Sequence, residues 1–374
     1  IAMAVAAVPE GLPAVVAIAL ALGAQRMLKR QSLIRKLPAV ETLGSVTVIC
    51  SDKTGTLTAN EMQLKVLDVA GRTRELDWLP GQHSPDLSYE MLETALQLLV
   101  LGGALNNDAQ LVTDPESPGD YLVLGDPTEG ALVSAAANLG LTKPMLEVTL
   151  PRIGEVPFSS ERKRMSTIHH FGPQAALYMP MFSSIEAGEA DSQLALTKGA
   201  VDGMLEICER VYVDNQVVAL DSDWRERIEG ASETMAAEGL RVLGLGYKLL
   251  QPGSNEKIDE RIEQGMVFIG LYGMMDPPRP EALDAVHISQ VAGIRTIMIT
   301  GDHPLTAERI AREVGIAGEG HTIIGQKLDS LSDKELVELV AHSNVFARVT
   351  PEHKLRIVSA LQVGGEIVAM TGDG

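Results

Sequence analysis

Asp52 is the residue of this sequence whose position best suits a nucleophile. It follows an apolar run, Val46–Cys50, that is typical of a buried parallel strand. Gly55 allows a tight turn directly behind it, and the N–H groups of such a turn can face phosphate oxygens. Because a carboxylate can attack phosphorus to give an aspartyl phosphate, the pattern predicts phosphoryl transfer.

Two later strand-like runs, Ile294–Ile299 and Glu366–Met370, also end on polar residues. The residues that follow them are Thr300, Gly301, Asp302 and Asp373. Because the carboxyl ends of parallel strands meet at one edge of a sheet, we expect these groups near Asp52. Asp373 could share Mg²⁺ with Asp52, since Mg²⁺ prefers one or two carboxylates with phosphate oxygens and water. Lys354 would supply a point charge for the phosphoryl oxygens.

The elements around these runs predict an α/β domain with a doubly wound parallel sheet. Helical patterns at 304–314 and 332–342 alternate with the later strands. The first strand lies about 240 residues before the second, so a large insertion must interrupt the domain. The expected segments are 26–61 and 276–374 for the interrupted phosphorylation domain and 62–275 for the inserted domain.

Residues 1–25 predict a transmembrane helix that is broken at 8–13. The run has Glu10 as its single charge, can cross about 30 Å of hydrocarbon, and precedes a basic cluster typical of a cytoplasmic flank. Pro9 and Pro13 remove backbone donors, so freed carbonyls and the Glu10 carboxylate could bind a cation. A buried soluble helix with a capped glutamate is the alternative. Because the chain starts inside this run and stops just after Asp373, we expect a fragment.

The composition excludes several classes of protein. The net charge, 31 − 50 = −19, argues against nucleic-acid binding, which needs a basic face. The sequence has no CxxC or HExxH spacing for zinc and no G-x-x-x-x-G-K-[ST] loop for nucleotide phosphates. Two cysteines are too few for a disulfide scaffold. Cys208 is expected on an apolar helix face with Met204 and Ile207.

The motifs around these residues make the chain resemble a P-type ATPase of the haloacid-dehalogenase superfamily. They are ICSDKTGTLT around Asp52, KGA at Lys198–Ala200, DPPR at Asp276–Arg279, TGD at Thr300–Asp302 and TGDG at 371–374. Two further segments, VPEGLP at 8–13 and LPAVETLG at 37–44, are similar to the type II, calcium-pump-like branch.

The resemblance implies an enzyme that uses ATP and Mg²⁺ to drive cation transport through an aspartyl phosphate. The chain would comprise the fourth membrane helix, a split phosphorylation domain of haloacid-dehalogenase-like fold, and an inserted α+β nucleotide-binding domain. Its partners would be the lipid bilayer and, from the same polypeptide, the actuator domain and the remaining membrane helices. The resemblance also implies a multi-pass membrane protein. It would lie in the plasma membrane of a prokaryote, with residues 26–374 in the cytoplasm.

The functional residues of the family fall on matching positions of this sequence. Asp52, Lys354 and Thr300 would be catalytic. The nucleotide and its phosphates would contact Glu129, Phe158, Lys163, Lys198, Arg241, Thr300, Gly301, Asp302, Arg348 and Lys354. Mg²⁺ would bind Asp52, Thr54 and Asp373, and the transported cation would bind Val5, Val8 and Glu10. Without the resemblance, Phe158 could also be an ordinary core residue.

Three functions compete for this sequence. The first is an ATP-driven pump, with Ca²⁺ as the leading cation and Mn²⁺, Na⁺ and K⁺ as alternatives, because most cation ligands would lie on other helices. The second is a soluble phosphatase of the same superfamily, which would place a second Asp two residues after the nucleophile as an acid or base. This sequence has Thr54 there. The third, a catalytically dead scaffold, is disfavoured by the intact DKTGT.

Overall fold

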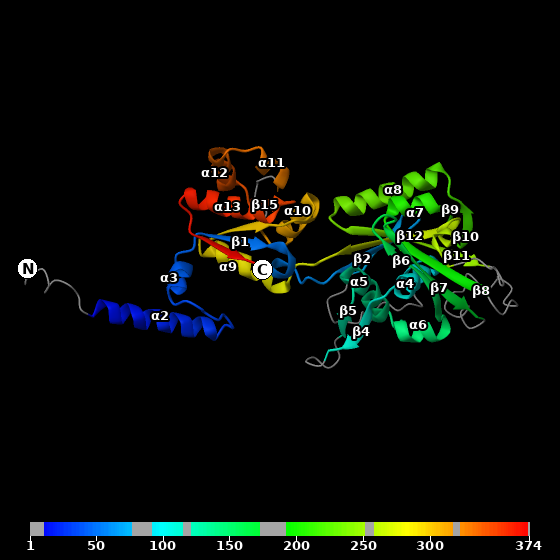
Figure 1. The fold of residues 1–374 in the computed structure, drawn as a ribbon, viewed down its shortest axis with the longest axis horizontal. Helices are drawn as coiled ribbons and strands as arrows, with labels where there is room; N and C mark the ends of the chain where they lie inside the picture. Colours follow the sequence, from blue (N-terminus) through cyan, green and yellow to red (C-terminus); the bar gives the residue numbers. More distant parts are fainter. Residues whose placement is uncertain are drawn as a thin grey trace, which may run out of the picture. The chain divides into compact units, whose positions relative to one another are not determined.

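The computed structural model describes residues 11–76, 92–114, 121–172, 192–250, 258–316 and 322–372. The predicted ligands of the transported cation, Val5, Val8 and Glu10, lie outside these ranges, and so does the predicted Mg²⁺ ligand Asp373. The chain forms two units (Figure 1): unit 1 contains Ile1–Ala59 and Pro278–Gly374, and unit 2 contains Asn60–Pro277. Unit 2 is therefore inserted in the sequence of unit 1. The chain passes from unit 1 to unit 2 at 59–60 and returns at 277–278. Each of these positions lies two residues from the boundary expected from the sequence, 61–62 and 275–276.

Unit 1 contains a five-stranded parallel sheet in the order β14-β15-β13-β1-β16. Its strands are β1 (Val48–Asp52), β13 (Arg295–Ile299), β14 (Ile323–Ile324), β15 (Val345–Ala347) and β16 (Val368–Thr371). The helices of its second part are α9 (Pro280–Val291), α10 (Pro304–Glu313), α11 (Gly325–Asp329), α12 (Asp333–His342) and α13 (Pro351–Val363). Figure 1 shows α9 and α13 on opposite sides of the sheet, as expected for apolar parallel strands. The predicted α/β fold with a parallel sheet is confirmed.

The start of α13 follows from its own sequence. Pro351 occupies the first turn, where a missing N–H leaves no hydrogen bond unmade. The Thr350 hydroxyl accepts the N–H of His353 at 3.3 Å, and Nδ1 of His353 accepts the N–H of Thr350 at 3.1 Å. This reciprocal cap fixes the first turn of α13, which carries Lys354.

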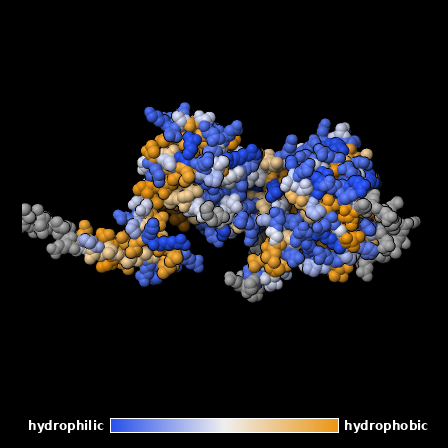
Figure 2. Space-filling view, in the orientation of Figure 1, coloured by the Kyte–Doolittle hydropathy of each residue, from blue (hydrophilic) through white to orange (hydrophobic). Residues whose placement is uncertain are grey.

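Unit 1 also contains α2 (Leu12–Leu28) and α3 (Pro38–Gly44). No residue of α2 is buried, and its apolar side chains form part of the orange surface in Figure 2. The large exposed apolar residues of α2 are Leu12, Val15, Val16, Ile18, Leu22 and Leu28. Within the described residues, no helix combines the length and the apolar character that a membrane crossing requires.

Unit 2 is built on a nine-stranded sheet in which β12 (Met266–Met275) is buried along its whole length. Its strands follow the order β10-β9-β12-β11-β8-β7-β6, with β2 paired to β12 and β3 paired to β2. Their bounds are β2 (Gln63–Val69), β3 (Arg72–Glu75), β6 (Arg152–Ser159), β7 (Arg164–Phe171), β8 (Ser192–Gly199), β9 (Cys208–Val213), β10 (Gln216–Ala219) and β11 (Arg241–Leu250). A separate hairpin pairs β4 (Gln110–Thr113) with β5 (Tyr121–Leu124).

The helices of unit 2 complete its core. They are α4 (Thr94–Leu105), α5 (Pro127–Asn138), α6 (Lys143–Thr149), α7 (Val201–Ile207), α8 (Ser222–Ala237) and the short 3₁₀ helix η5 (Glu260–Glu263). Ten of the twelve residues of α4 are buried, so this helix lies inside the unit. Gly102 permits its close packing, because a Cβ there would lie 2.4 Å from Leu245 Cδ2.

One expected position in unit 2 is wrong. Cys208 does not lie on a helix: α7 ends at Ile207, and Cys208 is the first residue of β9. The chain passes directly from helix to strand, and both sides of that junction are buried. Buried apolar residues therefore stand on both sides of the boundary, so periodicity in the sequence cannot locate it.

Candidate active site

Asp52 ends β1 at the carboxyl edge of the parallel sheet. Its Oδ1 accepts the N–H of Lys53 at 2.8 Å, and its Oδ2 accepts a charge-assisted hydrogen bond from Nζ of Lys354. The Asp52 side chain is 19% exposed, so the carboxylate is accessible to a substrate. The structure thus places Lys354 beside Asp52, although 302 residues separate them in the sequence.

The neighbouring strand β13 adds further polar groups to this edge. Ile299 is paired with Asp52, so Thr300 and Asp302 follow at the same end of the sheet. Asp302 Oδ2 lies 2.5 Å from Nζ of Lys53, whose side chain is only 6% exposed. Sequence reasoning missed Lys53, because a lysine next to a candidate nucleophile looks like a solvated charge. The sequence feature that could have indicated a role for Lys53 is its position inside the DKTGT motif.

The strand on the other side, β16, approaches Asp52 as well. Thr371 is hydrogen-bonded to Ser51 through their hydroxyls at 3.0 Å, and a Cβ on Gly372 would lie 3.5 Å from Asp52 Cβ. The residue after Gly372 is Asp373, the predicted second carboxylate, which lies outside the described residues. The end of β16 therefore brings Gly372 close to the predicted nucleophile.

The donors at this edge fit Mg²⁺ in their chemistry. Asp52 supplies one carboxylate, and Thr54 follows it in the turn of η1 (Lys53–Leu57) with extended backbone angles, φ −70° and ψ 131°. No group of three or more His, Cys, Asp or Glu side chains that could hold a metal occurs among the described residues. A single carboxylate suits Mg²⁺ when phosphate oxygens and water complete the coordination.

The loop before α13 is tied to the loop after β13. Arg348, with φ 50°, donates its N–H to the carbonyl of Asp302 at 3.0 Å. Val349 donates its N–H to the carbonyl of Thr300 at 3.1 Å. These two bonds hold together the loops that carry Arg348, Thr300, Gly301 and Asp302, and they place the first turn of α13 beside Asp52.

A second residue that sequence reasoning missed is Arg279. Its guanidinium donates to the carbonyl of Gly55 at 3.0 Å and to that of Thr58 at 3.1 Å. Gly55 has φ 71°, a left-handed conformation that glycine adopts without a steric penalty. Arg279 therefore holds the turn that follows Asp52 from a position 224 residues away.

Unit 2 contains five of the ten predicted nucleotide-binding residues: Glu129, Phe158, Lys163, Lys198 and Arg241. Lys198 is 5% exposed, and its Nζ donates to Glu129 Oε1 at 2.7 Å and to the carbonyl of Asn106. Burial lowers the pKa of Lys198, and the nearby carboxylate of Glu129 opposes that change. The other carboxylate oxygen of Glu129 accepts the N–H of Asp108 at 2.9 Å. Lys198 and Glu129 thus form a buried ion pair with fixed geometry.

Phe158 and Lys163 lie at the β6–β7 hairpin, and both are open to solvent. Phe158 is 62% exposed, so it is not a core residue, and the Lys163 side chain is 63% exposed. The hairpin is joined to the end of β8, because Ala200 donates its N–H to the Lys163 carbonyl at 3.1 Å. Arg241 donates to the Thr128 hydroxyl at 3.0 Å, one residue before Glu129.

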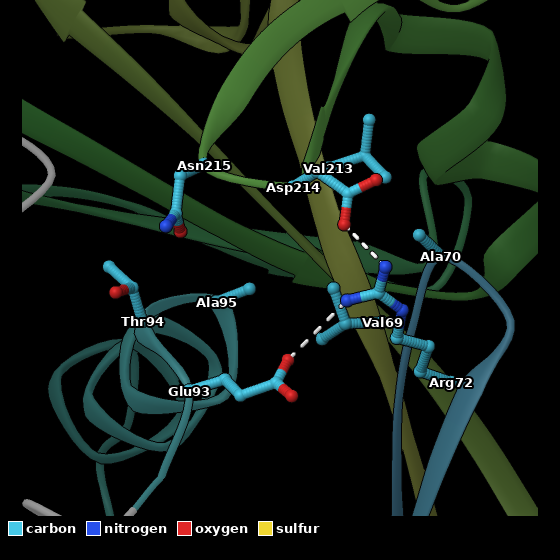
Figure 3. Close-up of a pocket in the computed structure, with 9 residues that line it drawn as sticks. All are labelled: Val69, Ala70, Arg72, Glu93, Thr94, Ala95, Val213, Asp214 and Asn215. Carbon is cyan, nitrogen blue, oxygen red and sulfur yellow. Dashed lines mark hydrogen bonds and ion pairs between the residues drawn. The ribbon is translucent and has the colours of Figure 1, made fainter.

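A cavity of about 370 Å³ lies elsewhere in unit 2. Figure 3 shows Arg72 there between the carboxylates of Asp214 and Glu93. None of the predicted nucleotide-binding residues is among its lining residues. The candidate site therefore does not coincide with this cavity.

The fold and the site together define a two-unit α/β protein whose parallel-sheet unit presents an aspartate–lysine pair at its carboxyl edge. The family model described as "P-type ATPase, cytoplasmic domain N" matches residues 95–281, half of the chain. The chain belongs to the P-type ATPase family, and the resemblance seen in its motifs is confirmed.

Curated relatives agree with this assignment. The chain is 43% identical over 389 residues to the cation-transporting ATPase pma1 of Synechocystis sp.. It is 42% identical to calcium-transporting ATPase 1 of Bacillus cereus and 39% identical to the calcium-transporting ATPase of Bacillus subtilis. Each match covers all of this chain and 40%, 38% and 40%, respectively, of the relative. The chain thus spans about two fifths of the length of these relatives.

Proposed function

We propose that the chain is the catalytic part of an ATP-driven cation pump that forms an aspartyl phosphate on Asp52. The observation that carries the proposal is the accessible carboxylate of Asp52 at the edge of a parallel sheet, in contact with Nζ of Lys354. In this proposal unit 1 is a phosphorylation domain of haloacid-dehalogenase-like fold, and unit 2 is its inserted nucleotide-binding domain.

The proposed reaction transfers the γ-phosphoryl group of ATP to Asp52. A carboxylate oxygen of Asp52 forms a bond to phosphorus, and the bond from phosphorus to the β,γ-bridging oxygen breaks and releases ADP. Lys354 stabilises the negative charge on the phosphoryl oxygens, and the Thr300 hydroxyl and the loop N–H groups orient them. Asp52, Thr54 and Asp373 would hold Mg²⁺, which neutralises phosphate charge when it is bound.

Unit 2 would hold the nucleotide. The exposed ring of Phe158 is suited to stack on adenine, and Lys163 adds a positive charge on the same hairpin. Lys198 and Glu129 would line the base pocket as a fixed pair, and Arg241 would reach a phosphate. Thr300, Gly301, Asp302, Arg348 and Lys354 of unit 1 would meet the phosphates during transfer.

The proposed cargo is a cation, with Ca²⁺ first and Mn²⁺, Na⁺ and K⁺ as alternatives. The supporting observations are the names of the relatives, two of which are calcium-transporting ATPases. Residues 1–25 would form a broken membrane helix in which Glu10 and the carbonyls of Val5 and Val8 bind the cation. Residues 26–374 would then lie in the cytoplasm of a multi-pass membrane protein, in the plasma membrane of a prokaryotic host.

The residue type at position 54, a threonine, favours a pump over a soluble phosphatase. A phosphatase of this superfamily would need an acid or base at that position to hydrolyse the aspartyl phosphate quickly. A threonine lets the phosphorylated state persist until another domain supplies the hydrolytic group, as a pump requires.

Transport by the complete polypeptide tests the proposal. Sealed vesicles that contain the full-length protein should accumulate ⁴⁵Ca²⁺ when ATP and Mg²⁺ are added, and Asp52→Asn should abolish the uptake. Uptake of Mn²⁺, Na⁺ or K⁺ in place of Ca²⁺ would change the identity of the transported cation and would still support an ATP-driven pump. ATP-independent release of phosphate from small phosphoesters by the wild-type chain, lost in Asp52→Asn, would favour the phosphatase.

A further inference from the structure

We propose that Glu263 is a positioning residue for nucleotide binding, because it fixes the hairpin that carries Phe158 and Lys163. The inference rests on the proposed function of unit 2. Glu263 lies in η5, far in the sequence from the hairpin, and its carboxylate is completely buried. A buried carboxylate is costly unless charged or polar groups satisfy its oxygens, so its partners indicate what it holds.

Three side chains of the β6–β7 hairpin satisfy Glu263. Nη1 of Arg162 donates to Oε1 at 2.6 Å, and Nε of Arg164 donates to Oε2 at 2.7 Å. The Ser166 hydroxyl also donates to Oε1, at 2.8 Å. Both guanidiniums are mostly buried, with side chains 12% and 13% exposed. Lys163 lies between the two arginines in the sequence, so both of its neighbours are bound to one carboxylate.

The same arrangement fixes the backbone before Phe158. Nη2 of Arg162 donates to the carbonyl of Pro157 at 2.6 Å. The register of β6 against β7 shifts between Val156 and Ser159, so the regular strand pairing is interrupted where Phe158 lies. Arg162, which Glu263 holds, therefore fixes the Pro157 carbonyl in the stretch where the regular hydrogen bonds between β6 and β7 are interrupted.

Phe158 and Lys163 themselves are mostly exposed and have little packing to orient them. Their orientation depends on the turn between them, in which Lys163 has φ 52° and donates its N–H to the Ser159 carbonyl at 2.6 Å. Glu263 thus acts on nucleotide affinity through the turn, without contact with the nucleotide. If the turn holds its binding geometry for a smaller fraction of the time, the apparent dissociation constant rises by the inverse of that fraction.

Glu263→Gln in the complete chain tests the inference. The amide keeps the shape of the side chain, but its NH₂ group meets one of the two guanidinium donors, so one arginine contact is lost. We expect the dissociation constant for ATP, measured by calorimetry, to rise about tenfold. We also expect faster amide hydrogen exchange over residues 158–164 without nucleotide, because the Lys163 amide lies inside the loosened turn.

Asp68→Asn is the matched control. Asp68 is also a buried carboxylate of unit 2, 2% exposed, and it accepts the Gly71 N–H at 3.1 Å and the Thr73 hydroxyl at 3.0 Å in the β2–β3 turn. The control should leave the ATP dissociation constant within twofold of wild type and should not change exchange over 158–164. Equal effects of the two variants on ATP affinity would reduce Glu263 to a general stabiliser of the unit.

The exchange measurement separates this inference from the proposed function. Unchanged exchange over 158–164 in Glu263→Gln overturns the inference, whatever happens to ATP binding. Faster exchange with unchanged ATP affinity also contradicts it, because the turn would then be loosened without consequence for the nucleotide. A wild-type chain that binds no ATP would contradict the nucleotide-binding role of unit 2, while the exchange result would still decide whether Glu263 fixes the turn.

Discussion

Nζ of Lys53 lies 2.5 Å from Oδ2 of Asp302, so the residue after the predicted nucleophile is ion-paired with the loop after β13. Lys53 is mostly buried and Asp302 is 34% exposed. The same Asp302 accepts the N–H of Arg348 through its carbonyl. One residue of the TGD motif therefore contacts two other loops of the site.

We predict that Asp302→Asn slows formation of the phosphoenzyme from ATP at least tenfold. The substitution removes the negative charge that faces the buried ammonium of Lys53, so the turn that carries Asp52 loses an anchor. The free energy of unfolding should fall by about 1–2 kcal/mol, less than for a fully buried pair because Asp302 is partly exposed. Rapid quench with labelled ATP measures the rate, and denaturant titration measures the stability.

Asp333→Asn is the control for this variant, because Asp333 is 98% exposed and its pair with Arg356 is 3.5 Å long. It should change neither quantity measurably. A normal phosphorylation rate in Asp302→Asn would show that the ion pair has no part in the reaction.

We predict that Arg279→Lys lowers the phosphorylation rate about tenfold and leaves ATP affinity unchanged. A lysine cannot donate to both the Gly55 and Thr58 carbonyls in the geometry of a guanidinium, so the turn after Asp52 becomes less fixed. A tenfold loss corresponds to about 1.4 kcal/mol of transition-state stabilisation. Arg312→Lys, at an exposed helix position, is the control. Equal losses of phosphorylation rate in the two variants would contradict a specific role of Arg279 in holding the turn after Asp52.

We predict that Phe158→Ala weakens ATP binding by about 1–3 kcal/mol, the range for a stacked base. Phosphorylation of the full-length protein by inorganic phosphate should stay near the wild-type level, because that reaction does not use the adenine. Ile153→Ala is a suitable control, since Ile153 is a half-exposed apolar residue of the same strand. Parallel loss by both phosphorylation routes would mean that Phe158 supports the fold instead.

We predict that His169 makes the stability of the chain fall in acid. Burial lowers the pKa of His169 to about 4, and its ring is bound to the Leu150 carbonyl and the Thr167 hydroxyl, each at 2.9 Å. Between pH 4 and 6.5 the unfolded chain binds more protons at this residue than the folded chain does. The stability contributed by neutral His169 is therefore complete above pH 6.5, is lost as the pH falls toward 4, and amounts to roughly 3 kcal/mol.

His169→Asn should accordingly flatten the change of unfolding free energy with pH between 4 and 6.5. Its neighbour His170 is only partly buried, so His170→Asn should keep the wild-type slope. Denaturant titrations at several pH values measure both slopes. The same steep slope in His169→Asn as in wild type would contradict the assignment.

The parallel sheet of unit 1 could be predicted from the sequence because its strands are short apolar runs that end on turn residues. The runs before Asp52 and Thr300 became β1 and β13, and their register brings Asp52 next to Ile299. Pairing along adjacent parallel strands then places the polar ends together, and this part of the site needs no further information.

The contacts that hold the site could not be predicted in the same way. The Arg279–Gly55 and Glu263–Arg162 contacts join segments 224 and 101 residues apart, and neither leaves a local pattern. The sheet of unit 2 escaped prediction for a similar reason, because β8, β11 and β12 pair across long connections. Tertiary packing decides such pairings, and propensity along the chain carries little information about them.

The central claim is that Asp52 receives the phosphoryl group. The most direct measurement is to incubate the full-length protein with [γ-³²P]ATP and Mg²⁺, quench with acid, and locate the label by peptide mass spectrometry. We predict an acid-stable, hydroxylamine-labile phosphate on the peptide that contains Asp52, and no label in Asp52→Asn. Label at the wild-type level in Asp52→Asn, or on another residue of the wild-type protein, would contradict it.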